Sequence, residues 1–131
     1  MGRDGDEAAA VLDFIRAFND QDLERLATIL DPEVVIHASR GLRRGVDEAL
    51  AWARRVDSGE LEQRIEVDGL RVDGDRVVAL IRRQWWWRKE NQLAREDEMA
   101  WVFELRDGRV ASWRPFEDRA AALATGDLSP A

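Results

Sequence analysis

The sequence predicts a single α+β domain in which helices pack on an antiparallel sheet. Three observations support this fold class: apolar residues at helical spacing before about residue 56, alternating runs from residue 61 to 116, and Asp-Gly turn signals between those runs. The length of 131 residues fits one domain, residues 1–131, without a linker. Because most helices precede most strands, we expect the helices to pack against one face of an antiparallel sheet.

The first two predicted elements are short helices. Within residues 7–19, one stripe at helical spacing contains Val11, Leu12, Phe14, Ile15 and Phe18. Asp20 or Asp22 can cap a second helix, which Asp31-Pro32 ends. The apolar residues of this second helix are Leu23, Leu26, Ile29 and Leu30.

A short strand and a third helix follow. The β-branched run of residues 34–36 predicts a strand that ends near His37, and the arginine-rich and glycine-containing stretch 39–45 predicts a loop. Ala49, Trp52, Ala53 and Val56 share one stripe of a helix from Val46 to about Val56.

Four strands and a terminal helix complete the chain. The alternating runs cover residues 62–72, 76–88, 96–105 and 109–116, with Asp-Gly at 73–74 and 107–108 between two of the pairs. Residues 118–126 predict a short helix. The expected order of elements is therefore ααβαββββα.

Composition excludes several classes of partner. Twenty Lys and Arg against 27 Asp and Glu give a net charge of -7, which disfavours nucleic acid and anionic membranes. With no cysteine and one histidine, we expect neither a metal nor another cofactor. The N-terminus lacks the apolar core of a signal peptide and no apolar stretch is long enough to span a bilayer, so we expect a cytoplasmic protein.

Three phrases of the sequence resemble a known family. They are FIRAFNDQDLERLATILDPEVVIHAS, RGVDEALAW and VFELRDGRVASWRPFEDRAAALATGDL. Their order and spacing are similar to the SnoaL-like branch of the nuclear transport factor 2-like superfamily, which includes ketosteroid isomerase and limonene-epoxide hydrolase. The resemblance implies a cone-shaped, strongly curved sheet whose internal cavity is closed by the N-terminal helices. It does not imply one reaction, because the family includes isomerases, cyclases, dehydratases, hydrolases and binding domains.

Strand alternation predicts which side chains share a face. A symmetric hairpin through residues 88–92 places Arg83 opposite Met99 and diagonal to Asp97, and a three-residue loop at 106–108 places Trp101 opposite Trp113. The resemblance implies that this odd-numbered face is concave. The expected ligand-binding residues are Trp52, Trp85, Met99, Trp101, Phe103 and Trp113.

The opposite face of the same strands carries Trp86, Val102 and Phe116. Relatives commonly dimerise through this outer sheet face, and a half-apolar surface suits such an interface. We therefore expect a homodimer through these three residues.

The candidate catalytic residues are His37, Arg83 and Asp97. The resemblance places His37 where ketosteroid isomerase has its general-base aspartate, but this chain has no tyrosine for the oxyanion hole and Trp101 replaces its aspartate. Arg83 matches the catalytic arginine of limonene-epoxide hydrolase, whereas Trp85 and Pro115 replace the two carboxylates. Asp97 is expected within reach of Arg83.

Three hypotheses of function follow. The first is a domain that binds a small apolar or aromatic molecule in a tryptophan-lined cavity. The second is an isomerase, cyclase, dehydratase or hydrolase for a small ring compound, with His37 as acid or base, Arg83 polarising an oxygen and Asp97 orienting Arg83. The third is a dimerising interaction domain that uses the outer sheet face.

Overall fold

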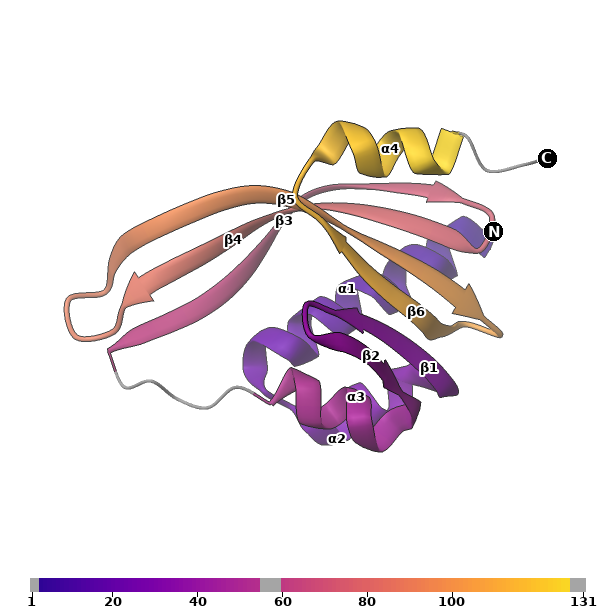
Figure 1. Cartoon of the computed structure of the whole chain (residues 1–131), viewed down its shortest axis with the longest axis horizontal. Helices are drawn as coiled ribbons and strands as arrows, with labels where there is room; N and C mark the ends of the chain where they lie inside the picture. Colours follow the sequence, from indigo (N-terminus) through magenta and orange to yellow (C-terminus); the bar gives the residue numbers. More distant parts are fainter. Residues whose placement is uncertain (1–2, 55–59, 128–131) are drawn as a thin grey trace.

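A curved sheet of six strands forms the centre of the computed structural model, which describes residues 3–54 and 60–127 (Figure 1). The strands lie in the order β2-β1-β6-β5-β4-β3. Neighbouring strands are antiparallel except β1 and β6, which are parallel. The strand bounds are β1 Leu30–Ala38, β2 Gly41–Arg44, β3 Leu61–Asp73, β4 Arg76–Trp87, β5 Gln92–Arg106 and β6 Arg109–Phe116.

The helices of the described residues cover both faces of this sheet, and not one face as we expected, because the apolar residues of the terminal helix pack against the convex side. Helices α1, α2 and α3 lie on one side and α4 lies on the other (Figure 1). The side chain of Asp22 accepts a hydrogen bond of 3.1 Å from the backbone N–H of Arg25 and caps α2. The helix bounds are α1 Arg3–Asp20, α2 Leu23–Ile29, α3 Gly45–Ala53 and α4 Arg119–Asp127. The predicted α+β class is confirmed.

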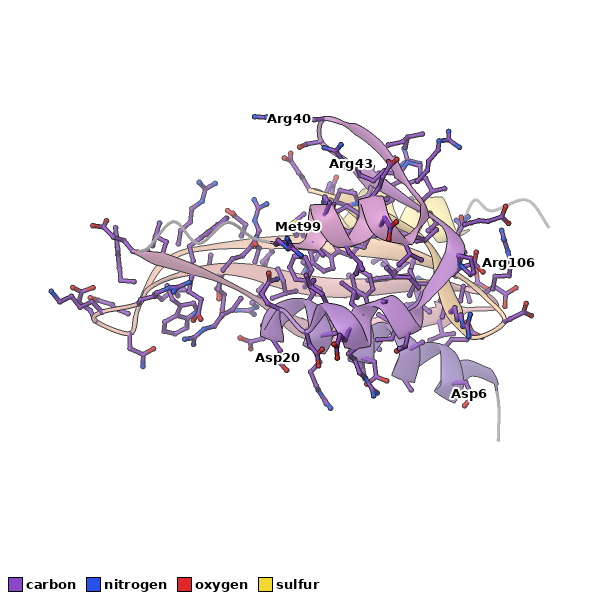
Figure 2. The ribbon with its side chains drawn as sticks, turned by 90° about the horizontal axis from the view of Figure 1, so that it is seen from below. Asp6, Asp20, Arg40, Arg43, Met99 and Arg106 are labelled. Carbon is purple, nitrogen blue, oxygen red and sulfur yellow. The ribbon has the colours of Figure 1, made fainter. Side chains whose placement is uncertain are left out.

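Two predicted elements differ from the structure. The stretch expected to be a loop contains β2, which forms a short antiparallel hairpin with β1 because the outer edge of β1 offers it backbone partners. Arg40 and Arg43 of this hairpin project from the outside of the molecule (Figure 2). Helix α3 ends at Ala53, earlier than expected, and Val56 lies outside the described residues.

The hairpin registers differ from the predicted ones by two residues. Arg83 pairs with Asp97 and not with Met99, because the two strands meet at Trp87 and Gln92 around a tighter turn, and a bulge between Trp85 and Trp86 adds one residue on β5 before the register continues. The turn between β5 and β6 has two residues, Asp107 and Gly108, both with positive φ, where we expected three. A shift of two residues leaves every side chain on its predicted face, since side chains alternate with a period of two.

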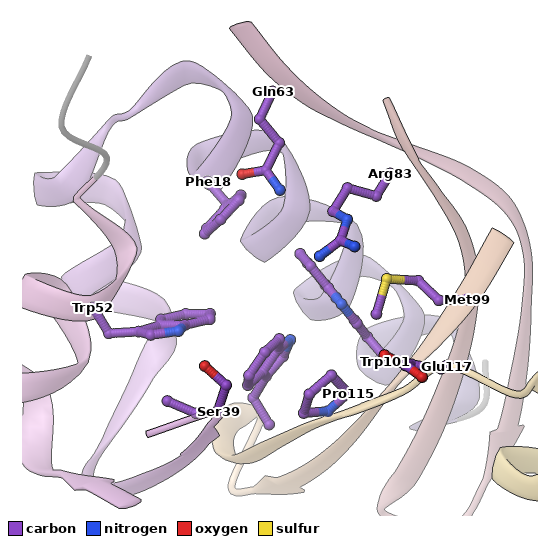
Figure 3. A pocket seen from close by; sticks show the side chains of 11 residues that line it. Phe18, Ser39, Trp52, Gln63, Arg83, Met99, Trp101, Pro115 and Glu117 are labelled. Carbon is purple, nitrogen blue, oxygen red and sulfur yellow. The ribbon is translucent and has the colours of Figure 1, made fainter. Parts of the chain in front are cut away.

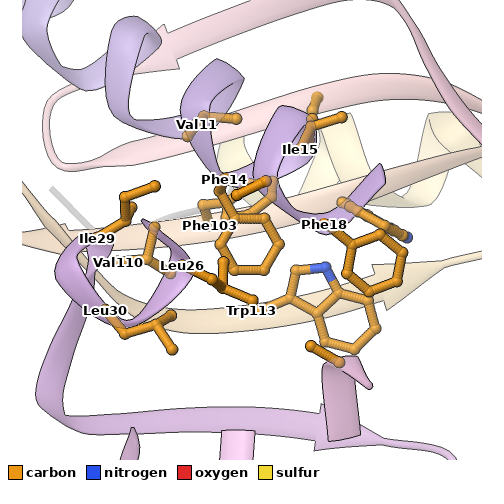
Figure 4. Close-up of a cluster of buried hydrophobic side chains, with 14 of the residues drawn as sticks. Val11, Phe14, Ile15, Phe18, Leu26, Ile29, Leu30, Phe103, Val110 and Trp113 are labelled. Carbon is orange, nitrogen blue, oxygen red and sulfur yellow. The ribbon is translucent and has the colours of Figure 1, made fainter. Parts of the chain in front are cut away.

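A large hydrophobic core lies between the concave face and the three N-terminal helices (Figure 4). Phe14 of α1 packs edge-on against Phe103 of β5, with ring centroids 5.1 Å apart, and against Trp101 at 6.5 Å. The predicted apolar stripe of α1 faces this core, since its residues Val11, Phe14, Ile15 and Phe18 are all buried. The Asn19 side chain accepts a hydrogen bond from the Ile65 N–H and donates one to the Ile65 carbonyl, both 2.8 Å, and so ties α1 to edge strand β3.

A second, smaller core lies under α4 on the convex face. Its members are Val78, Ala100, Val102 and Ala122, with Leu80, Phe116 and Leu123 partly buried against them. Val102 is 6% exposed, so it offers little surface to the expected dimer interface, and Phe116 is partly covered as well. Trp86 lies apart from this cluster, with its Nε1 donating to Gln84 Oε1 at 3.0 Å. The helix that the sequence predicted at the C-terminus thus covers part of the face on which we expected a partner.

Arg119 anchors α4 at its first residue. Its guanidinium donates hydrogen bonds to the carbonyls of Ile81 at 2.8 Å and Met99 at 3.2 Å, and to the Asp68 carboxylate at 2.7 Å. Arg82 binds the same carboxylate at 2.8 Å. Hydrogen bonds from Arg119 and then Arg82 hold the pKa of Asp68 below its ordinary value.

Candidate ligand-binding site

A cavity of about 490 Å³ lies between the concave face of the sheet and helices α1 and α3 (Figure 3). Strands β1, β3, β4, β5 and β6 each contribute side chains, and the segments after β1 and after β6 add one each. The residues that line it are Phe18, Ala38, Ser39, Trp52, Gln63, Arg83, Met99, Trp101, Trp113, Pro115 and Glu117. Both the sheet and the helices are therefore needed to form the cavity.

Aromatic rings in mutual contact form one wall. Trp113 lies 4.4 Å from Trp52 and 5.2 Å from Trp101 between ring centroids. Phe18 lies 5.6 Å from both Trp52 and Trp101. The sequence predicted six ligand-binding residues. Four of them, Trp52, Met99, Trp101 and Trp113, lie on the cavity wall.

Phe103 and Trp85, the other two predicted residues, do not line the cavity. Phe103 is completely buried in the core, where Phe14 of α1 covers it. Trp85 has the expected concave orientation but lies further along β4, half-buried, with the Arg83 guanidinium 5.8 Å from its ring centroid. Alternation grouped these side chains on one face correctly, but it could not show where along that face the helices leave space.

His37 lies on the opposite side of the sheet from the cavity. Its neighbour Ala38 lines the cavity and Ile36 is fully buried in the concave core, so alternation along β1 turns His37 toward the convex face. There it lines a separate pocket with Arg114 and Ser112. The predicted grouping of His37 with Arg83 and Asp97 does not form.

Arg83 and Asp97 do meet, as directly paired residues of β4 and β5. The Arg83 Nη2 lies 3.3 Å from Asp97 Oδ2, and Arg95 Nε lies 3.3 Å from the other carboxylate oxygen. The side chains of Arg83 and Asp97 are 36% and 28% exposed. The Nε of Arg83 is buried and has no hydrogen-bond partner among the described residues. Asp97 thus forms an ion pair with Arg83, which is the one cationic side chain among the described residues of the cavity wall.

Several lining residues were missing from the sequence-based set. Glu117 continues the odd-numbered series of Trp113 and Pro115 by two residues, so extending the alternation past the end of β6 would have found it. Gln63 lies opposite Trp85 in the register between β3 and β4. Phe18 belongs to the predicted stripe of α1, but its place at the cavity depends on how α1 crosses the sheet.

Residues 3–54 and 60–127 contain neither a candidate metal cluster nor a membrane-spanning helix. No group of three or more His, Cys, Asp or Glu side chains there could hold a metal ion. No helix in the same residues is long and apolar enough to cross a membrane.

Comparison with protein families identifies the class of protein. A model of the SnoaL-like domain matches residues 11–113, and the chain belongs to this family. Among curated proteins, no sequence matches the chain.

Solved structures share the fold at low sequence identity. An LEH-like epoxide hydrolase from M. tuberculosis is 21% identical with a TM-score of 0.72, covering 97% of this chain and 96% of its own. A putative polyketide cyclase from Xanthomonas campestris is 15% identical with a TM-score of 0.74, covering 95% and 99%. A protein with a ketosteroid isomerase-like fold from Catenulispora acidiphila, in complex with trimethylamine, is 16% identical with a TM-score of 0.68, covering 92% and 97%.

Proposed function

We propose that this SnoaL-like domain binds a small, largely apolar ring compound in its cavity and holds an oxygen atom of that compound with Arg83. The observation that carries the proposal is the joined wall of Trp52, Trp101, Trp113 and Phe18 around a space that Arg83 also lines. Aromatic faces bind flat or CH-rich rings by dispersion at small entropic cost. The volume of about 490 Å³ lies within the range of small-molecule sites.

Arg83 determines the polar end of the proposed ligand. Its charge is partly balanced by Asp97 at 3.3 Å, and Asp97 in turn contacts Arg95. A guanidinium donates hydrogen bonds and accepts none, so it favours a carbonyl, phenol or carboxylate oxygen over an amine. The ligand class is therefore a ring compound with at least one accessible oxygen.

Intrinsic tryptophan fluorescence tests the proposal directly. Titration with steroid, terpenoid and polyketide-like compounds should change the emission saturably for at least one oxygenated ring compound. Arg83→Met should weaken its binding about 10- to 100-fold, the equivalent of a lost charge-assisted hydrogen bond. Arg95→Met is the matched control, because Arg95 contacts the same Asp97 but is 70% exposed and is not among the lining residues. An unresponsive spectrum across the panel, or equal weakening by both variants, would contradict the proposal.

A second candidate function is catalysis on the same bound compound. The observation that favours it is the presence of Glu117 and Arg83 on one cavity, with Asp97 behind Arg83. Such an arrangement can polarise an oxygen through Arg83 while the Glu117 carboxylate removes a proton from water or substrate. In this mechanism Glu117 takes the acid-base role that the sequence suggested for His37.

Separate measurements of turnover and binding distinguish the two functions. If the domain is an enzyme, Glu117→Gln should lower turnover of a bound epoxide or ketone by about 100-fold or more while the fluorescence titration is preserved. Glu33→Gln, at a side chain that is 84% exposed, should leave both unchanged. Turnover that survives Glu117→Gln would exclude this mechanism.

A further inference from the structure

The pocket that contains the only histidine of the chain lies on the convex face, away from the cavity. Its volume is about 250 Å³. Strands β1, β4, β5 and β6 form its floor, and the residues that line it are His37, Arg76, Val102, Glu104, Ser112, Arg114 and Phe116. Its position makes it independent of the ligand site proposed above.

The charges around this pocket are not balanced. Arg76 pairs with Glu104, the one carboxylate among the lining residues, at 3.4 Å. Arg114 lies with its guanidinium 5.2 Å from the Phe116 ring centroid, and no described carboxylate forms an ion pair with it. The His37 imidazole forms no hydrogen bond within the described part of the chain, although the backbone of His37 takes part in the β1–β2 ladder. The pocket is therefore locally cationic in a chain of net charge -7.

The strand register brings three hydrogen-bond donors of different kinds together. Ser112 pairs with Glu104, and Arg114 pairs with Val102, so both point to the convex face from β6. His37 reaches the same pocket from the neighbouring strand β1, which runs parallel to β6. A guanidinium, a hydroxyl and an imidazole around one pocket suit the several oxygens of a tetrahedral oxyanion.

We propose that this pocket binds a phosphomonoester, with the phosphate held by Arg114, His37 and Ser112. Val102 and Phe116 supply an apolar side of the pocket for the group esterified to the phosphate. The guanidinium of Arg114 is kept in place by its contact with the Phe116 ring. Glu104 does not oppose the anion, because Arg76 neutralises it.

The single histidine makes this proposal testable by proton NMR. Phenyl phosphate, added at pH 7 and constant ionic strength, should shift the imidazole resonances saturably, with a Kd of about 1 mM or below. Inorganic phosphate should bind several-fold more weakly, since it leaves the apolar side of the pocket unfilled. Arg114→Gln should weaken phenyl phosphate about tenfold or more, and Ser112→Ala by a smaller factor.

Matched variants and a fold check complete the experiment. Arg43→Gln is the control, because Arg43 lies on β2 opposite Ile36 and outside this pocket. Near-ultraviolet circular dichroism of the tryptophans verifies that each variant keeps its tertiary structure. The proposal is overturned if phenyl phosphate causes no saturable shift up to about 20 mM, if Arg43→Gln weakens it as much as Arg114→Gln, or if inorganic phosphate binds equally well.

Discussion

Replacing Phe103 with alanine should lower the free energy of unfolding by about 3–5 kcal/mol and leave ligand binding in the cavity unchanged. Phe103 is 0% exposed, and its ring makes edge contacts with Phe14 at 5.1 Å and Trp101 at 6.4 Å. Each such aromatic pair contributes about 0.5–1.5 kcal/mol beyond the buried area, so the upper part of the range is expected. A domain of this size has about 5–15 kcal/mol of stability, so the loss is a large part of it and is readily measured.

Urea denaturation followed by far-ultraviolet circular dichroism measures this loss, and the melting temperature should fall by roughly 10–20 °C. Trp85→Ala is the matched comparison, because the sequence assigned both residues to the ligand site. Trp85 is half-buried near the end of β4, so its removal should cost about 1 kcal/mol. If Phe103→Ala costs no more than Trp85→Ala, or weakens the cavity ligand as Arg83→Met does, then Phe103 lines the cavity and its assignment to the core is wrong.

Three further predictions concern the frame around the cavity. Gly108→Ala should lower the free energy of unfolding by about 1–2 kcal/mol, measured by urea denaturation, because the residue has a φ of +78°. An unchanged midpoint would show that the turn adapts to alanine. Asn19→Leu should speed hydrogen exchange of the Ile65 amide and lower the free energy of unfolding by about 1–3 kcal/mol, because both hydrogen bonds to Ile65 are lost. Unchanged exchange would mean that other contacts protect the edge strand. Arg119→Met should lower the free energy of unfolding at pH 7, and this free energy should then fall less steeply as the pH is lowered. The depressed pKa of Asp68 stabilises the fold above the ordinary carboxyl pKa, and this contribution is lost as the pH falls through the folded value; without Arg119 the pKa returns toward normal. Equal acid slopes for variant and parent would contradict this assignment.

Local patterns in the sequence were sufficient for the elements and for the faces of the strands. The stripe from Val11 to Phe18 predicted a helix with a buried face, and the odd-numbered series predicted that Arg83, Met99 and Trp101 share one face of the sheet, which the family resemblance implied to be concave. These predictions held because helical and strand periodicity depend on backbone geometry within one element. They survived a register error of two residues, since an even shift does not exchange the faces of a strand.

Which residues line the site depended on contacts between elements that are distant in the sequence. The bulge at Trp85 and Trp86 determined that Arg83 faces Asp97 directly, and no local pattern specifies a bulge. The path of α1 across the sheet buried Phe103 while it left space at Trp101 and Trp113.

The orientation of β1 and the position of α4 were decided in the same way. Sequence predicted the strand that ends near His37, but only the burial of Ile36 against the helices shows that His37 faces outward. Sequence likewise predicted α4, but not that it would cover Val102 on the convex face. Alternation defines two faces of a strand and is symmetric between them, so the tertiary packing of the helices determines which face becomes the cavity.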